Sequence, residues 1–121
     1  LIIKKCKKFI INRELADRFN DNKLRWRNLP MFMMRPIAQV AQYGETKYAL
    51  YNYLKGGSQN QYLGSLKRHL DSYEDSTQSD NDVESGLSHM YHIAWNALVC
   101  AYMLEHFPEL DDRFKINKDG D

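Results

Sequence analysis

The chain has 121 residues, of which 43% are hydrophobic and 27% charged, and its formal net charge is +1. This length and composition predict one soluble globular domain. The balanced charge gives no bulk field that would draw the chain to nucleic acid, and no apolar run approaches the roughly 20 residues of a membrane helix. Two isolated cysteines, Cys6 and Cys100, favour a reducing compartment over a disulfide framework. We therefore expect a cytoplasmic protein with neither nucleic acid nor a membrane as partner.

The start of the chain is expected to form an arm over residues 1–17. Asn12 is typical of an N-cap and predicts a short helix over Arg13–Phe19. Turn-forming residues at 20–22 end this helix. The following segment, Lys23–Pro30, is expected to be extended or irregular.

Apolar residues at helical spacing predict a helix over Met31–Tyr43, with Gly44 as the C′ residue that stops it. Pro36 allows two interpretations. It is either the first residue of a helix that begins there, or a kink in one that begins earlier. Residues 45–54 could form a short helix or an ordered loop.

The second half of the chain predicts two further helices. An S-x-x-Q capping box at Ser58 opens a helix that runs to about Glu74. A polar, acidic loop over 75–85 then leads into a strongly apolar helix from Gly86 to about Phe107. A helix that is apolar all round is expected to be buried.

These elements predict an all-α fold, a small helical bundle over residues 18–107 that completes its core by self-association. A polar tail over 108–121 follows it. Met33, Met34 and the apolar helix are the expected contributors to a homo-oligomer contact.

Four polar residues share one stripe of the apolar helix, at i, i+4, i+7 and i+11: Ser85, His89, His92 and Asn96. His69 is expected to point inward from the preceding helix, and Asp82 and Glu84 lie just upstream of the stripe. Buried polar groups must be hydrogen-bonded or ligating. The cluster is therefore either a cation or phosphate site, or a polar core network in which the histidines satisfy each other and nearby tyrosines.

Two further pairs could contact a nucleotide. Lys47 and Arg68 are candidate phosphate ligands, although such side chains are often only solvated helix charges. Tyr48 and Tyr53 could stack on a base, although such clusters are more often packing surface.

Four motifs follow one another in order within a similarity that runs over residues 18–104: Arg18–Trp26 followed by Leu29-Pro30, Tyr43–Tyr48 followed by Asn52–Gly56, Leu66–Leu70, and Asp82–His89 followed by His92–Ala97. They resemble the strings "RFNEGKxRW…LP", "YGAxKY…NWxKG", "LLRHL" and "DPESGLxHxxHAxWNA" of phage-encoded dATP/dGTP diphosphohydrolase-like proteins. The resemblance implies an all-α protein related in role to the MazG-like nucleotide pyrophosphohydrolases. Those enzymes use a divalent cation to cleave a (d)NTP between the α- and β-phosphates, giving the monophosphate and pyrophosphate.

On this basis we expect a metal-dependent purine dNTP diphosphohydrolase that shapes the nucleotide pool of a phage-infected cell. The expected metal ligands are His69, His89, His92 and Glu84, for Mg²⁺, Mn²⁺, Co²⁺ or Zn²⁺. The expected catalytic residues are Asp82 or Glu84 for the nucleophile, and Lys47 and Arg68 for the phosphates. The expected nucleotide-binding residues are Lys47, Tyr48, Asn52, Tyr53, Arg68 and Asn96.

The sequence departs from the family pattern at one aromatic position, where Tyr53 replaces the usual Trp. The paired E-x-x-E and E-x-x-D motifs of MazG proper are also missing. Histidine is a better ligand for Mn²⁺, Co²⁺ or Zn²⁺ than for Mg²⁺, so these three ions suit the expected site better than Mg²⁺ does. An alternative function stays open, which is a non-catalytic nucleotide-binding protein or a structural helical protein of a phage.

Overall fold

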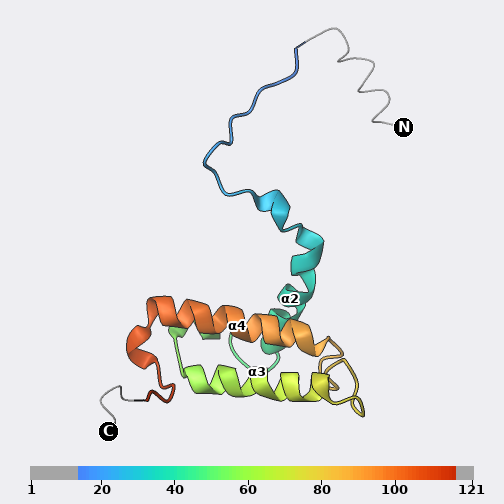
Figure 1. The fold of residues 1–121 in the computed structure, drawn as a ribbon, viewed down its shortest axis with the longest axis vertical. Helices are drawn as coiled ribbons and strands as arrows, with labels where there is room; N and C mark the ends of the chain where they lie inside the picture. Colours follow the sequence, from blue (N-terminus) through green and yellow to red (C-terminus); the bar gives the residue numbers. More distant parts are fainter. Residues whose placement is uncertain (1–13, 117–121) are drawn as a thin grey trace.

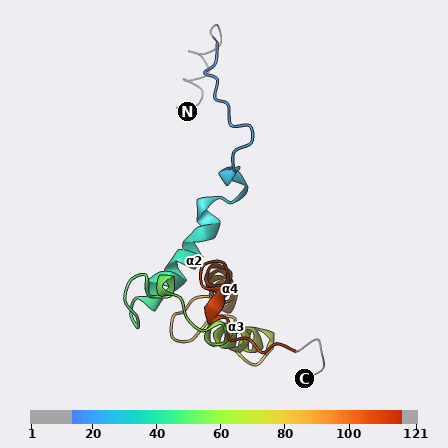
Figure 2. The same ribbon diagram turned by 90° about the vertical axis from the view of Figure 1, so that its left-hand side faces the viewer.

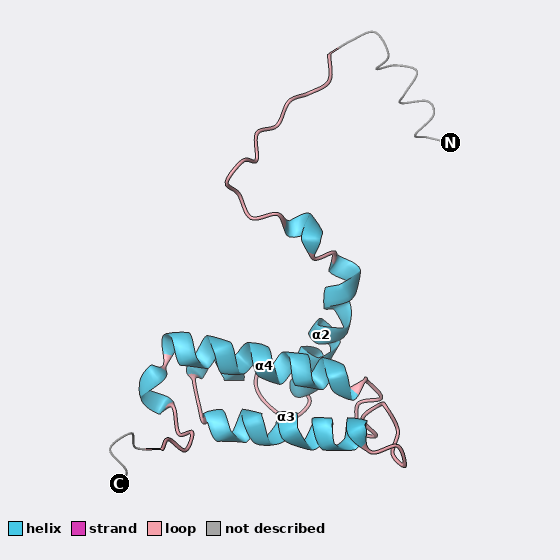
Figure 3. Cartoon of the chain, in the orientation of Figure 1, coloured by secondary structure: helices cyan, strands magenta, loops and turns pink. Residues whose placement is uncertain are grey.

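The computed structural model describes residues 14–116, and within this range the chain is helical (Figure 1; Figure 3). Its α-helices are α2 (Met31–Gly44), α3 (Gln59–Glu74) and α4 (His89–His106). Short 3-10 turns, η1 (Trp26–Asn28), η2 (Asn52–Lys55) and η3 (Pro108–Leu110), lie between and after them. The described residues contain no strand, only one isolated bridge. The predicted all-α fold class is confirmed.

Helices α3 and α4 form an antiparallel pair, and the C-terminal half of α2 packs against α4 (Figure 1; Figure 2). The hydrophobic side chains that are fully enclosed in this arrangement are Val40, Val99 and Met103. Residues 14–30 and the first half of α2 extend away from the helix pair in both views. No helix in the described part of the chain is long and apolar enough to cross a membrane.

Helix α2 agrees with the predicted Met31–Tyr43 segment at its start and ends one residue later, at Gly44. Pro30 is its N-cap, and Pro36 lies inside it, so the helix begins before Pro36. Gly44 is the last helical residue and not a left-handed C′ residue, so that prediction is wrong. The chain continues in a right-handed turn because the N–H groups of Thr46 and Lys47 bond back to the last carbonyls of α2.

The predicted helix over Arg13–Phe19 is wrong. Residues 14–19 are not helical, and Arg13 lies outside the described residues. These side chains are exposed, and a short helix without a packing partner is marginal in water. The turn that follows is confirmed, since the N–H of Lys23 donates to the carbonyl of Asn20 and Asn22 is left-handed (φ 66°).

Helix α3 has the predicted cap, because the Ser58 hydroxyl accepts the N–H of Gln61 at 3.2 Å. Helix α4 begins at His89 with Ser88 as N-cap, three residues later than predicted. Gly86 instead belongs to a turn with φ 73°, and its N–H donates to the carbonyl of Asp82. Glycine is favoured at this left-handed position.

Helix α4 is not buried all round, which corrects the expectation from its composition. One face is enclosed by α2 and α3 and carries His89, His92, Asn96, Val99 and Met103. The opposite face is apolar but exposed, with Leu98 57% and Met90 44% accessible. A helix that meets its neighbours on one side only keeps its remaining apolar surface in water.

The division of the chain at 17/18 and at 107/108 stays a prediction. The start of the tail is nevertheless held against α3. Asp112 accepts hydrogen bonds from the Ser58 hydroxyl and, at 3.0 Å, from the N–H of Asn60. The Asn60 amide also donates to the carbonyl of Asp112 at 2.6 Å.

Candidate active site

An open cleft of about 850 Å³ lies between the end of α2, the 45–55 segment, α3, α4 and the acidic loop. Ten of the eleven sequence-predicted site residues line it: Lys47, Tyr48, Asn52, Tyr53, Arg68, His69, Asp82, Glu84, His92 and Asn96. His89 is the exception. It lines a smaller hollow of about 400 Å³, which shares Asp82 and Glu84 with the cleft.

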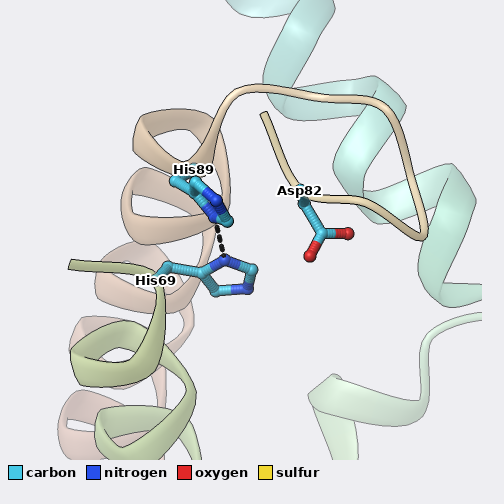
Figure 4. A group of neighbouring side chains, drawn as sticks. All are labelled: His69, Asp82 and His89. Atoms are coloured by element: carbon cyan, nitrogen blue, oxygen red, sulfur yellow. Dashed lines mark hydrogen bonds between the residues drawn. The ribbon is translucent and has the colours of Figure 1, made fainter. Parts of the chain in front are cut away.

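The three predicted histidines meet where α3 faces the start of α4, and Figure 4 shows two of them, His69 and His89. The Nδ1 atoms of His69 and His89 are 2.8 Å apart and share a hydrogen bond. The rings of His69 and His92 are stacked, with centroids 4.3 Å apart and planes 11° apart. His89 and His92 are buried, and His69 is partly buried.

Asp82 lies beside the histidines on the loop that joins α3 to α4 (Figure 4). His69, Asp82 and His89 each offer one ligand atom. These three atoms lie within 4.8 Å of one another, which is close enough to hold one metal ion. The loop backbone fixes this position. Asp82 donates its N–H to the carbonyl of Leu87, and the N–H of His89 donates to the carbonyl of Asp80.

The protonation tendencies of this group suit cation binding. Burial lowers the pKa of both His69 and His92, which favours the neutral imidazole. Burial opposes ionisation of Asp82, but hydrogen bonds from Ser85 lower its pKa overall. A metal ion binds neutral imidazole and ionised carboxylate, so these tendencies favour the ligating forms.

Ser85, His92 and Asp82 do not form a nucleophilic triad. The Ser85 hydroxyl is 2.7 Å from Nε2 of His92, and Asp82 approaches the same nitrogen at 3.9 Å. In a triad the carboxylate orients the ring through its other nitrogen. The serine–histidine contact is therefore part of the polar network that holds the loop against α4.

The charged residues at the mouth of the cleft form a second group. Glu84 accepts a hydrogen bond from the Tyr43 hydroxyl at 2.6 Å and from the Lys47 ammonium at 2.9 Å, both at Oε2. These bonds lower the pKa of Glu84 and raise that of Lys47. Glu84 is thus engaged here and lies outside the three-residue group that could hold a cation.

The other end of the cleft is aromatic. Tyr53 packs edge-on against Trp95, with ring centroids 4.9 Å apart, and against Tyr102 at 6.4 Å. Tyr48 is 62% exposed at the rim. This region offers flat apolar surfaces of the kind on which a nucleobase stacks.

Asn96 has a structural contribution to the site. Its side-chain amide donates to the carbonyl of His92 at 2.8 Å and to the Ser65 hydroxyl at 3.3 Å, which ties α4 to α3. Arg68 is exposed and lines the cleft from α3.

Two residues of the site were missed as functional candidates. They are Trp95 and Tyr43, which the sequence places only within the motif strings. Tyr43 lies four residues before Lys47, one helical turn away, and this spacing was the available signal.

The helical cleft with its histidine–carboxylate group and its aromatic end is consistent with a nucleotide-acting hydrolase. Residues 13–113 match the family model described as dATP/dGTP diphosphohydrolase, N-terminal. The chain therefore belongs to the dATP/dGTP diphosphohydrolase N-terminal family, which confirms the resemblance found in the sequence. No curated protein matches the chain, and no solved structure matches it.

Proposed function

We propose that the chain binds dATP or dGTP in the 850 Å³ cleft and hydrolyses it to the monophosphate and pyrophosphate. Family membership supports hydrolysis of a purine dNTP. The observation that carries the proposal is the division of one cleft into an aromatic end and a charged end. A nucleoside triphosphate has the same division, with a flat base at one end and a polyanion at the other.

The charged end supports the assignment of the phosphates. Lys47 and Arg68 both line the cleft and come from different elements, Lys47 from the turn after α2 and Arg68 from α3. Both can donate charge-assisted hydrogen bonds to phosphate oxygens. At the aromatic end, Tyr53 and Tyr48 would contact the base, with Asn52 beside them as a polar partner for its edge.

The donor set fits a divalent cation that accepts imidazole. Two ligands about 2.1 Å from one ion and at right angles lie about 3 Å apart, close to the 2.8 Å between the two Nδ1 atoms of His69 and His89. Asp82 would supply the oxygen ligand. Two nitrogens and one carboxylate favour Mn²⁺, Co²⁺ or Zn²⁺ over Mg²⁺. When bound, such an ion supplies positive charge against the phosphates and acidifies water.

Asp82 and Glu84 are the candidates for orienting and deprotonating the attacking water, because both carboxylates line the cleft. Asp82 is held by the Ser85 N–H at 2.9 Å. His92 stacks on the ring of His69, approaches this carboxylate at 3.9 Å and holds the loop through Ser85. We assign His92 to the support of the cation group.

The test is incubation of the purified chain with each dNTP and each of the four metals, with chromatography of the nucleotides and assay of pyrophosphate. We expect dATP or dGTP to give the monophosphate and pyrophosphate in equal amounts. His69→Ala should abolish turnover, and His106→Ala should retain it, because His106 is exposed in the last turn of α4. Folded protein that releases no pyrophosphate with any metal would refute the enzymatic proposal.

A specific observation favours a second candidate, a nucleotide-binding protein without turnover. One ring nitrogen of each histidine already has a partner in the chain, since Nδ1 of His69 bonds Nδ1 of His89 and Nε2 of His92 bonds the Ser85 hydroxyl. Among the described residues, no buried side-chain nitrogen or oxygen lacks a partner. Binding of dGTP in the micromolar range without pyrophosphate release, measured by calorimetry with all four metals, would support this candidate.

A further inference from the structure

Tyr43 is the side chain that joins the separate parts of the charged end of the cleft. It lies in the last turn of α2, and its contacts reach the turn after α2, the acidic loop and α4. Its hydroxyl donates to Oε2 of Glu84 at 2.6 Å. Its ring meets His92 edge-on, with centroids 6.1 Å apart and planes at 88°. One residue therefore contacts both the charged rim and the histidine cluster.

The same ring also contacts Lys47. The Lys47 ammonium lies 5.1 Å from the Tyr43 ring centroid while it donates to Oε2 of Glu84 at 2.9 Å. The Lys47 ammonium and the Tyr43 hydroxyl thus converge on one carboxylate oxygen, Oε2 of Glu84. The i, i+4 spacing of Tyr43 and Lys47 is what brings the ammonium over the ring.

An isolated pair of Lys47 and Glu84 would not fix the ammonium in one place. Their side chains are 48% and 68% exposed, and exposed ion pairs are weak because water screens them and their side chains lose entropy. The tyrosine adds a hydrogen bond to the carboxylate and a cation–π attraction for the ammonium. A three-membered group is held more firmly than the pair, since each partner restricts the others.

We propose that Tyr43 is a positioning residue, which holds Lys47 and Glu84 at the mouth of the cleft so that the lysine ammonium faces incoming phosphates. This inference rests on the proposed function, in which the charged end of the cleft takes the triphosphate. The polyanion competes with Glu84 for Lys47, and the tyrosine ring keeps the ammonium in place during the exchange. The Tyr43 hydroxyl keeps the Glu84 carboxylate beside the lysine ammonium.

The first experiment needs no substrate. Lysine labelling with an amine-reactive acetylating reagent is followed by mass spectrometry, with the exposed Lys67 on α3 as the internal reference. In Tyr43→Leu, which removes ring and hydroxyl, we expect Lys47 to label about threefold faster relative to Lys67. Tyr43→Phe, which keeps the ring, should give a smaller rise. Tyr73→Leu on α3 should leave the ratio unchanged, since Tyr73 has no part in this group.

The second experiment measures kinetics with dGTP and dATP. Loss of a phosphate contact that is made in both ground and transition states raises KM more than it lowers kcat. We expect KM to rise about tenfold in Tyr43→Leu and about threefold in Tyr43→Phe, with kcat changed by less than about twofold. A partly unfolded variant would instead lose kcat with KM unchanged, so this pattern separates positioning from a loss of structure.

The outcomes are distinct. An unchanged Lys47 ratio in both Tyr43 variants overturns the inference, and so does an equal rise in Tyr73→Leu. A faster Lys47 in the Tyr43 variants, with no turnover by the wild-type chain, supports the positioning role and refutes the proposed reaction alone. If Tyr43→Leu fails to fold, the Tyr43→Phe labelling ratio and KM decide the matter.

Discussion

The Nδ1 atoms of His69 and His89 face each other at 2.8 Å, although the two residues lie on different helices and border different hollows. At this separation the two nitrogens can share either a proton or a cation. In the absence of an ion the hydrogen bond links α3 to α4. Under the proposed function, ligation of a cation would replace this bond, so metal binding and helix pairing would use the same two atoms.

The first prediction concerns metal binding. Addition of Zn²⁺ or Mn²⁺ to the metal-free chain should raise the melting temperature. At a hundred times the dissociation constant the stabilisation is about 2.7 kcal/mol, which corresponds to roughly 10–20 °C for a domain of this size. Scanning calorimetry measures the shift. His106→Ala should keep it and His69→Ala should lose it; an equal shift in both variants would contradict the assignment of the ligands.

The second prediction concerns Gly56, where the chain turns into α3. Its φ is +82°, and a Cβ there would lie 2.7 Å from the Phe107 ring. Gly56→Ala should therefore reduce the free energy of unfolding by about 1–3 kcal/mol, through backbone strain and overpacking. Gly44→Ala is the matched control because Gly44 is helical and open, and it should be neutral or stabilising by up to about 1 kcal/mol. Urea unfolding of both variants compares them, and equal midpoints would refute the prediction.

The third prediction is an acid-sensitive tail. Hydrogen bonds from the Ser58 hydroxyl and the Asn60 N–H lower the pKa of Asp112. A lowered folded-state pKa means that this stabilisation is present above the ordinary aspartate pKa of about 3.9 and is lost as the pH falls through the folded-state value. Asp112→Asn should therefore be less stable than wild type at pH 7, with the difference narrowing below about pH 4.

Urea midpoints between pH 7 and pH 2.5 measure this difference. Asp71→Asn, an exposed substitution on α3, the helix whose start Asp112 contacts, provides the control and should follow the wild-type curve. A difference between Asp112→Asn and wild type that stays constant over the whole range would show that the carboxylate contributes nothing through its charge.

The fourth prediction concerns self-association, which we infer from exposed apolar surface on two parts of the chain. Phe32 on α2 is 66% exposed and Leu98 on α4 is 57% exposed, whereas few hydrophobic residues are fully enclosed. Apolar surface of this extent is costly in water and is typical of an interface. Sedimentation at micromolar concentration should show a species larger than a monomer. Phe32→Glu with Leu98→Glu should shift it to the monomer, and Gln39→Glu should not; a monomeric wild type would refute the inference.

The elements with strong local signals could be predicted from the sequence. The Ser58 cap opens α3 where expected, and α2 begins at Met31 as its apolar spacing indicates. The helix over Arg13–Phe19 could not be predicted correctly because an N-cap residue alone does not form a helix without a packing partner. The predicted start of α4 at Gly86 was wrong because Gly86 adopts a left-handed conformation, which belongs to a turn and not to a helix.

The approach of three histidines was predictable in part. The spacing of His89 and His92 places them on one helix face, and an inward His69 follows from the periodicity of α3. The partners of Glu84 were not predictable, since they depend on how α2 meets the acidic loop, 37 residues further along the chain from Lys47. The separation of His89 from the main cleft depends on the path of the same loop.

That loop, which joins α3 to α4, also carries Asp82 and Glu84. Connections between antiparallel helices are usually among the most tolerant places for inserted residues. Here the loop both connects the two helices and carries the two carboxylates that the proposed function uses. An added or deleted residue should shift these carboxylates relative to the histidines without unfolding either helix, so the length of the loop sets the geometry of the proposed site independently of the helix pair.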